Sequence, residues 1–362
     1  MRRAAALIVG GGPAGSAAAI ALARGGARPE LIERTSGDRD LVCGGFLGWD
    51  ALARLRRLGL DPEALGARPI RRLRLVAGTR TVEADLPRAA AGLSRRRLDS
   101  ALLAAAEQAG AVVTRGRAVR AVEEGRLRLD DGEWLEAESL FLATGKHELR
   151  GAARPLDERS EPPAAGLRAA LPPRPDLDAA LAGIIELHLY AGGYAGLLLQ
   201  EDGAANFCLS VSRARLAAAG SPEARVDALA AEAPLLAERL GADRPSRWEA
   251  IAGVPYGWRA AATEPGLFRL GDQAAVIASL AGDGIAVALA SGEAAARAWL
   301  DGGPCASVDY QRGFARRAAR PVGIAEALRH GAERGLTRQA MLRILKLVPG
   351  VAGLAARLTR IG

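Results

Sequence analysis

The sequence predicts an α/β protein: a Rossmann-type domain, a β-rich domain interleaved with it, and a helical extension at the C-terminus. Three observations lead to this fold. At the N-terminus a buried strand, a glycine-rich turn and an alanine-rich helix follow one another, and residues 266–300 repeat the order of strand, glycine turn and helix. Between them, residues 184–190 alternate side chains with the period of a β-strand.

Composition narrows the class of protein. The chain has 362 residues, of which 49% are hydrophobic and 25% charged, which is typical of a globular protein with room for two cores. Three widely spaced cysteines and three histidines indicate neither a disulfide framework nor a metal site, and they favour the reducing cytoplasm. The apolar run after "MRR" breaks at glycines after six residues, too short for a signal peptide or a membrane span.

The positive charge is concentrated near the C-terminus. Residues 310–362 contain eleven Lys or Arg and two Glu, a net charge of +9, so the overall +8 leaves −1 for residues 1–309. Aromatic residues make up 4% of the chain and do not interleave with the basic ones, so nucleic acid is not an expected partner.

The N-terminal turn has the spacing of a dinucleotide site. Gly10, Gly12 and Gly15 form a G-x-G-x-x-G pattern, in which the glycines allow a tight turn, close approach to a pyrophosphate and close helix packing. Glu33 ends the next strand, where a carboxylate accepts a hydrogen bond from a ribose 2′-hydroxyl. This carboxylate disfavours the 2′-phosphate of NADP at the same site. The alternative is a glycine-rich turn in an unrelated α/β protein.

Later motifs make the prediction more specific. Gly271-Asp272 follows a strand and precedes the turn at residues 282–284, and Arg95 begins an R-x-x-x-D pattern. With these motifs, residues 1–300 resemble the FAD-dependent oxidoreductases of the aromatic hydroxylase and geranylgeranyl reductase superfamily. The resemblance implies that Asp272 binds the ribityl chain, that the turn places a helix N-terminus beside the isoalloxazine ring, and that Arg95 contacts the cofactor. The alternative for Arg95 is a solvated helix residue.

The resemblance implies non-covalent FAD and a set of residues that contact it. These are Gly10, Gly12, Pro13, Ala14, Gly15, Glu33, Arg34, Cys43, Gly44, Arg95, Ala143, Thr144, Gly145, Gly271, Asp272, Gly282, Gly284 and Ile285. Thr144 stands where the hydroxylases carry an Asp, and there is no second G-x-G-x-x-G pattern. NADH or NADPH is therefore expected to reduce the flavin as a transient visitor.

The same resemblance divides the chain into domains. Residues 1–36, 88–155 and 250–302 are expected to form the FAD-binding domain, 37–87 and 156–249 the substrate domain, and 303–362 a helical segment. In the substrate domain, Glu186, His188 and Tyr190 share one face of a strand, which either meets solvent or lines a cavity over the flavin. Tyr194 is a further candidate for lining the active site, and Gly196 stands where the reductases have a Trp.

Cys43 poses a separate question. The geranylgeranyl reductases carry Cys-Gly-Gly close to the flavin, and Cys43-Gly44-Gly45 matches it. Three roles are open: a residue that lines the active site without acting as a nucleophile, a proton donor or redox thiol, and a buried structural thiol. A reactive thiolate needs a nearby cation, and within four residues Arg39 is the one that the sequence offers.

These observations favour a monooxygenase that hydroxylates or oxidises an apolar small molecule such as a polyketide, phenol or lipid. The alternatives are a flavin-dependent reductase of a prenyl or other double bond and, last, a flavin-binding protein without catalysis. The tail leaves two interpretations open. Met341, Leu342, Leu345 and Val348 share one side of a basic helix that either contacts an anionic membrane surface or packs on the body of the protein. The oligomeric state is not predicted.

Overall fold

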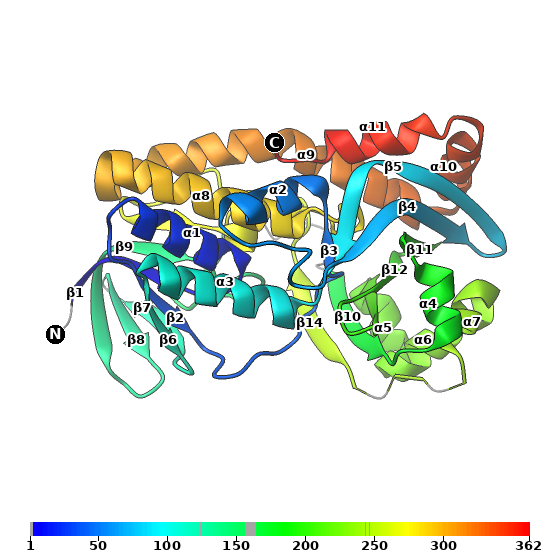
Figure 1. Cartoon of the computed structure of the whole chain (residues 1–362), viewed down its shortest axis with the longest axis horizontal. Helices are drawn as coiled ribbons and strands as arrows, with labels where there is room; N and C mark the ends of the chain where they lie inside the picture. The colour runs from blue at the N-terminus through cyan, green and yellow to red at the C-terminus, as the bar shows by residue number, and fades with distance from the viewer. Residues whose placement is uncertain (1–2, 124, 156–163, 243, 246) are drawn as a thin grey trace.

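The computed structural model describes residues 3–123, 125–155, 164–242, 244–245 and 247–362. Two mixed sheets occupy opposite halves of an elongated molecule, and long helices from the C-terminal third run along one side of both (Figure 1). The predicted α/β fold with a helical C-terminal extension is confirmed.

The first sheet has the parallel centre of a Rossmann-type domain. Its seven strands run in the order β6-β2-β1-β9-β8-β7, with β15 also paired to β9. The parallel strands are β1 (Arg3–Val9), β2 (Glu30–Glu33), β6 (Val112–Arg115), β9 (Trp134–Leu142) and β15 (Leu267–Arg269). The antiparallel strands β7 (Val119–Glu123) and β8 (Arg126–Leu129) complete it, and their apolar side chains pack against those of β1.

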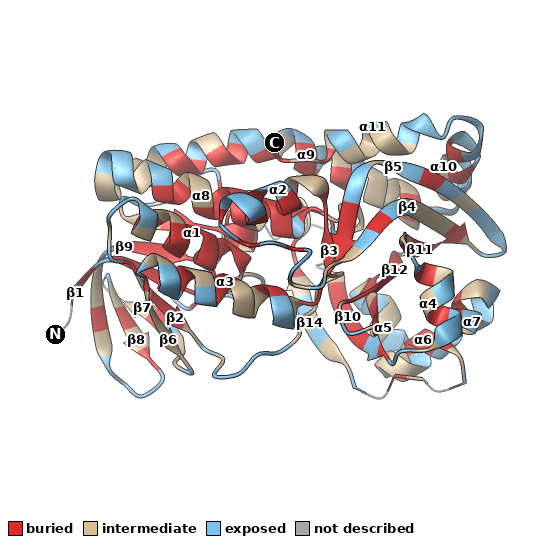
Figure 2. Ribbon diagram, in the orientation of Figure 1, coloured by how far each residue is buried: buried red, intermediate tan, exposed pale blue. Residues whose placement is uncertain are grey.

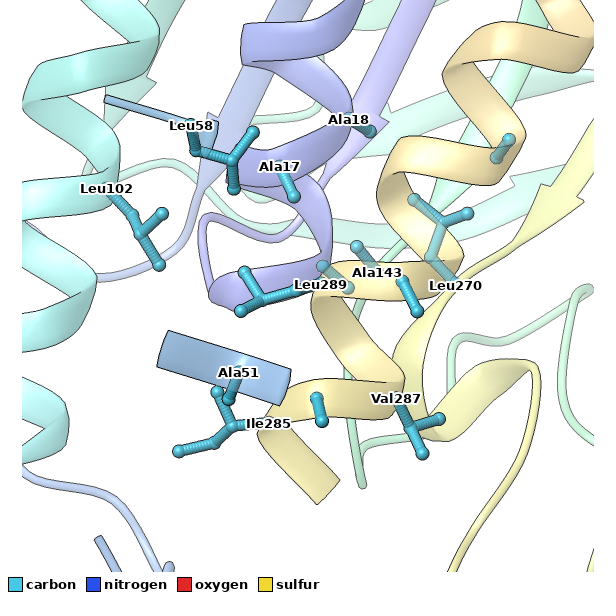
Figure 3. Packing of buried hydrophobic residues seen from close by; sticks show 14 of the residues in the cluster. Ala17, Ala18, Ala51, Leu58, Leu102, Ala143, Leu270, Ile285, Val287 and Leu289 are labelled. Atoms are coloured by element: carbon cyan, nitrogen blue, oxygen red, sulfur yellow. The ribbon is translucent and has the colours of Figure 1, made fainter. Parts of the chain in front are cut away.

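Helices cover the other face of this sheet. They are α1 (Pro13–Arg24), α2 (Trp49–Arg57), α3 (Arg95–Ala109) and α8 (Gly284–Gly302). Small side chains let them approach closely: Ala17 and Ala18 of α1 share one apolar cluster with Leu102 of α3 and Leu289 of α8, and all four are labelled in Figure 3. All four belong to the largest apolar core, so α1 is held on both sides.

The second sheet has eight strands in the order β14-β10-β13-β12-β11-β4-β5-β3. They are β3 (Phe46–Leu47), β4 (Arg68–Ala77), β5 (Arg80–Gly92), β10 (Ala164–Leu171), β11 (Ile184–Tyr190), β12 (Gly193–Leu199), β13 (Ala205–Val211) and β14 (Glu249–Val254). Four short helices follow its strands: α4 (Pro175–Leu181), α5 (Arg213–Ala219), α6 (Pro222–Glu232) and α7 (Pro234–Leu240). Apolar side chains of α4, α6 and α7 form one core with β10, β12 and β13.

Two of the expected domain boundaries lie inside strands of the structure. β5 continues to Gly92 and β14 begins at Glu249, so the boundaries at 88 and 250 fall within strands of the second sheet. Helix α2 lies within the segment expected to belong to the substrate domain, yet Leu52 and Leu55 pack into the core of the first domain. The apolar face of α2 needs this core because its polar face is strongly charged.

The C-terminal helices pack on the body of the protein. Helix α9 (Ser307–Glu333) inserts Tyr310 and Phe314 into the largest core, and α10 (Gly335–Leu347) and α11 (Gly350–Leu358) lie against β5. Single 3-10 turns occur at η1 (Gly271–Gln273), η2 (Ser279–Ala281) and η3 (Gly303–Ala306). Among the described residues, no helix has the length and apolar character needed to cross a membrane.

The contact between α1 and α8 predicts how two helix glycines differ. A Cβ at Gly292 of α8 would lie 2.3 Å from the Ala14 carbonyl oxygen, whereas one at Gly323 of α9 would meet no atom within 4 Å. We expect Gly292→Ala to lower the free energy of unfolding by about 1–3 kcal/mol through overpacking. Gly323→Ala should raise it by about 0.5–1 kcal/mol through helix propensity. Urea denaturation measures both, and equal effects would contradict this packing.

Candidate active site

One cavity of about 920 Å³ lies between the two sheets. Its walls include the residues that follow the carboxyl ends of β1, β2, β9 and β15, which is where α/β sheets bind ligands. The opposite wall is formed by β11, β12, β13 and β14 of the second sheet. The cavity therefore joins a nucleotide-type edge to the surface of the expected substrate domain.

The first glycine turn is built for close backbone approach. Gly10 has φ of 108°, and a Cβ there would lie 2.4 Å from the Ala143 carbonyl oxygen. A Cβ at Gly15 would lie 1.9 Å from the Gly10 carbonyl oxygen, so this glycine brings α1 against the turn. The helix begins after Gly12 with no side-chain cap, which leaves backbone N–H groups at the cavity for an anion.

Glu33 is held rigidly at the adjacent strand end. Its carboxylate accepts hydrogen bonds from the Gly11 N–H at 2.7 Å, the Thr35 N–H at 2.9 Å and the Thr35 hydroxyl at 2.6 Å. Burial raises the pKa of Glu33, but these hydrogen bonds outweigh it, so the net pKa is lowered. The carboxylate is therefore ionised and lines the cavity as an acceptor.

Arg95 is oriented by its partner in the R-x-x-x-D pattern. Its Nε and Nη2 donate to the two oxygens of Asp99 at 2.8 and 2.7 Å, and its guanidinium lies near Gly12 at the cavity wall. Burial lowers the pKa of Arg95, and the carboxylate of Asp99 more than reverses this, so the net pKa is raised. The alternative of a solvated helix residue is wrong, because the Arg95 side chain is only 14% exposed and its guanidinium lies between the turn and Asp99.

Asp272 and Lys146 face each other across the same wall. The Lys146 Nζ lies 3.3 Å from the Asp272 carboxylate, and the Arg154 guanidinium donates to the Asp272 carbonyl oxygen at 3.0 Å. The Asp272 carboxylate raises the pKa of Lys146, and burial works against it. Thr144 also lines the cavity and donates its hydroxyl to the His147 carbonyl oxygen at 2.7 Å. Lys146 is a further cavity residue, and none of the sequence motifs predicted it.

The N-terminus of α8 also lies at the cavity, and an ion pair with the C-terminal end of the chain stabilises the turn before it. Gly282 and Gly284 line the cavity, while the fully buried Asp283 between them pairs with Arg360 from the far end of the chain. The Arg360 guanidinium also lies 4.2 Å from the ring of Trp49. Ion pairing and cation–π contact therefore balance a carboxylate that is buried directly behind the turn. The sequence pattern gave no signal for this pair, because 76 positions separate the two residues.

Cys43 lines the cavity and has more cations near it than its sequence neighbours suggest. Its thiol sulfur accepts from the Gly45 N–H at 3.4 Å and interacts with the Arg95 guanidinium, and Lys146 also lies within electrostatic range. Both cations come from distant parts of the chain, so Arg39 is not the one cation near this thiol. Cys208 lines the same cavity, and burial followed by the nearby Cys43 raises its pKa to about 12.

The structure brings most of the expected cofactor residues to one cavity. Gly15 is the exception, because it packs behind the turn. The cavity wall contains Gly10, Gly12, Pro13, Ala14, Glu33, Arg34, Cys43, Gly44, Arg95, Ala143, Thr144, Gly145, Gly271, Asp272, Gly282, Gly284 and Ile285. Tyr194 also reaches the cavity, from β12 of the second sheet.

Glu186, His188 and Tyr190 are placed differently from either expectation. They are buried on the face of β11 away from the cavity, where Glu186 pairs with Arg74 at 2.6 Å and with His188 at 2.8 Å. Helices α6 and α7 cover this face and bring Arg225 and Arg239 to it. These helices give the polar side chains buried charge partners, so both solvent and the cavity are wrong as their surroundings.

The apolar face of the same strand lines the cavity instead. Ile185 and Leu187 of β11 and Leu198 of β12 face it, together with Ile251 and Val254 of β14. The period-2 pattern separates the two faces of the strand correctly, and a wholly apolar face ordinarily indicates packing in a core. An apolar face suits a substrate cavity equally well.

The comparisons agree with this geometry. A family model described as an FAD binding domain matches residues 3–148, from β1 to the residues after β9. These residues are therefore similar to an FAD-binding domain. Together with the fold and the relatives, this confirms the resemblance to the FAD-dependent oxidoreductases of the aromatic hydroxylase and geranylgeranyl reductase superfamily.

A protein described as a quinolone synthase and one described as a geranylgeranyl diphosphate reductase are both similar to this chain. A putative 2-heptyl-3-hydroxy-4(1H)-quinolone synthase of Rhodococcus erythropolis is 36% identical over 38% of this chain and 38% of its own. The chloroplastic geranylgeranyl diphosphate reductase of Oryza sativa subsp. japonica is 38% identical over 33% of this chain and 26% of its own. The match therefore spans well under half of either relative. Solved PqsL of P. aeruginosa, in complex with 2-aminobenzoylacetate, shares the fold with a TM-score of 0.74 at 19% identity, covering 95% of this chain and 100% of that chain.

The residues around the cavity fit FAD. The uncapped start of α1, the ionised Glu33 and the Asp272–Lys146 pair offer contacts for a pyrophosphate, a ribose and a polyol chain. We expect Asp272→Ala to copurify with much less flavin, because it removes a cavity carboxylate and leaves Lys146 unpaired. Flavin absorbance per chain after gel filtration measures this. Asp301→Ala, at the exposed end of α8, is the control, and a full flavin content in Asp272→Ala would contradict this role.

The buried pair behind α8 gives a second prediction. Arg360→Ala leaves Asp283 buried without its partner and should lower the free energy of unfolding by about 3 kcal/mol. Adding Asp283→Asn should restore most of this loss, since the neutral amide needs no cation. Thermal denaturation with flavin release measures both variants, with the exposed Arg357→Ala as the control. If Asp283→Asn gives no rescue, the pair does not carry the effect.

Proposed function

We propose that the protein is an FAD-dependent monooxygenase that hydroxylates or oxidises a neutral, apolar small molecule such as a polyketide, a phenol or a lipid. When bound, FAD would supply the redox chemistry, taking up electrons from a nicotinamide donor and passing them to O₂. The observation that carries the proposal is the continuity of one cavity between the FAD-binding turn and the apolar face of the second sheet.

The substrate part of this cavity has an apolar wall. Most side chains that line it from the second sheet and the loops beside it are apolar or aromatic, and they include Ile185, Leu187, Tyr194, Leu198, Cys208, Ile251, Val254, Tyr256, Val276 and Leu280. Glu249 of β14 also lines the cavity, and its carboxylate pairs with Arg168 at 3.3 Å. Among these described residues there is no Lys or Arg, whereas the basic side chains of the cavity belong to the FAD-binding half. Such a wall favours a neutral apolar substrate and helps to exclude water from the reacting groups.

A small polar group interrupts this wall and offers a way to orient a substrate. The Tyr256 hydroxyl lies 2.7 Å from the Ser279 hydroxyl, and Tyr194 also bonds with Ser279. Burial raises the pKa of Tyr194 well above its usual value, so its hydroxyl stays protonated and can donate a hydrogen bond. A substrate carbonyl or hydroxyl oxygen would be the acceptor.

The second candidate function is reduction of a prenyl or other double bond. The Cys43-Gly44-Gly45 motif and the similarity to a geranylgeranyl diphosphate reductase favour it. A diphosphate headgroup would nevertheless need cations, and the described wall of the substrate part has none. A prenyl substrate of this chain would therefore be a neutral one. A flavin-binding protein without catalysis remains the third candidate.

NADH or NADPH would reduce the flavin as a transient visitor. Arg34, Arg39 and Arg120 gather at the FAD-binding end of the cavity, where burial and then the charge of Arg39 lower the pKa of Arg34. Such a group of like charges suits an anionic dinucleotide. The three free cysteines of the protein also suit the cytoplasm, the compartment that would supply NADH or NADPH.

Oxygenase and reductase activities separate in one experiment. The flavoprotein is reduced anaerobically with NADH or NADPH and then mixed with a neutral quinolone, phenol or menaquinone, either with ¹⁸O₂ or without oxygen. The proposal predicts oxygen-dependent turnover with ¹⁸O in the product. Product formed without oxygen, and carrying two added hydrogens, would establish the reductase instead.

Tyr194→Phe tests the proposed orientation of the substrate. We expect unchanged flavin content and reduction rate, but kcat/KM lower by about tenfold, as for one lost hydrogen bond. Tyr190→Phe is the matched control, because its hydroxyl donates to the Ser210 carbonyl oxygen on the opposite face of the sheet. Equal kinetic losses in both variants would show a general effect on the sheet and contradict a role for Tyr194 in orientation.

A further inference from the structure

The exposed apolar side chains of this protein are concentrated at one end. Among the described residues, seven large apolar side chains are exposed, and six of them lie between positions 336 and 354. These six form the surface that we call the tail face: Leu336, Ile344, Leu347, Val348, Val351 and Leu354. They belong to α10, α11 and the turn between them, at the upper right of Figure 1, where Figure 2 shows extensive exposure. Scattered exposed leucines are ordinary, but such a concentration is not.

The tail face is held outward by its own helix. Leu342 and Leu345 are 2% and 5% exposed and fix α10 against the body, while Leu336 and Leu347 are 90% and 80% exposed. Met341, Leu342, Leu345 and Val348 were expected on one side of the helix, but Val348 is exposed and the two leucines are buried. One face of the helix therefore packs on the protein, and another face remains apolar and open.

The charge around the tail face has one sign. Residues 334–362 contain six Lys or Arg and no Asp or Glu. Arg334, Arg343, Lys346 and Arg357 are exposed beside the apolar side chains. Two such faces would repel each other, which disfavours a second copy of the chain as the partner. The partner should offer an apolar interior to the exposed apolar side chains and a negatively charged surface to the basic ones. An anionic lipid bilayer has both, in its acyl chains and its headgroups.

We propose that the tail face docks the protein on an anionic membrane surface, with the six apolar side chains at the acyl boundary and the basic ones among the headgroups. The helices lie parallel to the interface and do not span it. The segment just before the face lies close to the proposed substrate cavity, because Ala332 at the end of α9 belongs to one apolar cluster with Leu187 and Tyr194 of the cavity wall. Docking would therefore bring the cavity close to a reservoir of apolar molecules. The lipid contact itself does not depend on which reaction the flavin performs.

Vesicle flotation of the full-length flavoprotein tests this proposal. We expect binding to vesicles of phosphatidylcholine with phosphatidylglycerol, weak binding to phosphatidylcholine alone, and weaker binding at high salt. Leu336→Gln with Leu347→Gln should reduce binding at least tenfold without changing flavin content, since both side chains are exposed. Arg343→Gln with Lys346→Gln should reduce it as well. Leu300→Gln, a leucine that is 40% exposed on α8, is the matched control and should bind like the natural protein.

Several results would overturn the proposal. One is the absence of binding to the anionic vesicles, and another is binding that the double leucine variant leaves unchanged. Light scattering that shows a dimer, dissociated by the same variant, would assign the face to a second copy of the chain. Polyglutamate that competes with the vesicles and binds as tightly would assign it to an acidic protein. Flavin reduction by NADH or NADPH, measured without vesicles, reports on the proposed function separately.

Discussion

The close contact between α1 and α8 is the constraint on which the site depends. The two helices come from opposite ends of the first domain, and their N-termini both meet the cavity. They can lie this close because Gly292 brings the backbone of α8 against the Ala14 carbonyl oxygen. Gly10 and Gly15 likewise leave room for close backbone contact, where the turn before α1 meets Ala143 at the end of β9. Small residues thus bring two positive helix ends to one ligand, which an anionic cofactor needs.

The second sheet carries charged side chains on one face and presents apolar side chains to the cavity on the other. On β11, Glu186 and His188 point to helices that supply Arg239, while Ile185 and Leu187 point to the cavity. The charged network is costly to bury, but Glu186 pairs with Arg74, His188 and Arg239, so it ties strand and helices together. The apolar face is left for a ligand. Strand periodicity alone can divide residues into these two groups, but it cannot say which group meets a cavity.

Much of the FAD-binding half was predictable because its physics is local. The glycine spacing, the acid at residue 33 and the Gly271-Asp272 pair each act within a few residues, and the structure brings them to one wall. The contacts that could not be predicted from the sequence share a different cause. Arg360 reaches Asp283, and Arg95 and Lys146 reach Cys43, over long stretches of chain that no spacing rule connects. The faces of β11 and α10 were misassigned because helices packed from elsewhere decide which side is covered.

The central claim is that this cavity holds FAD through both its adenosine and its flavin ends. A titration of flavin-free protein with FAD and with FMN tests it most directly, because FMN lacks the adenosine that Glu33 and the turn at Gly10–Ala14 would bind. The account predicts one FAD bound per chain, released on denaturation, and FMN bound at least a hundredfold more weakly. Equal affinity for the two flavins, or no uptake of either, would contradict it.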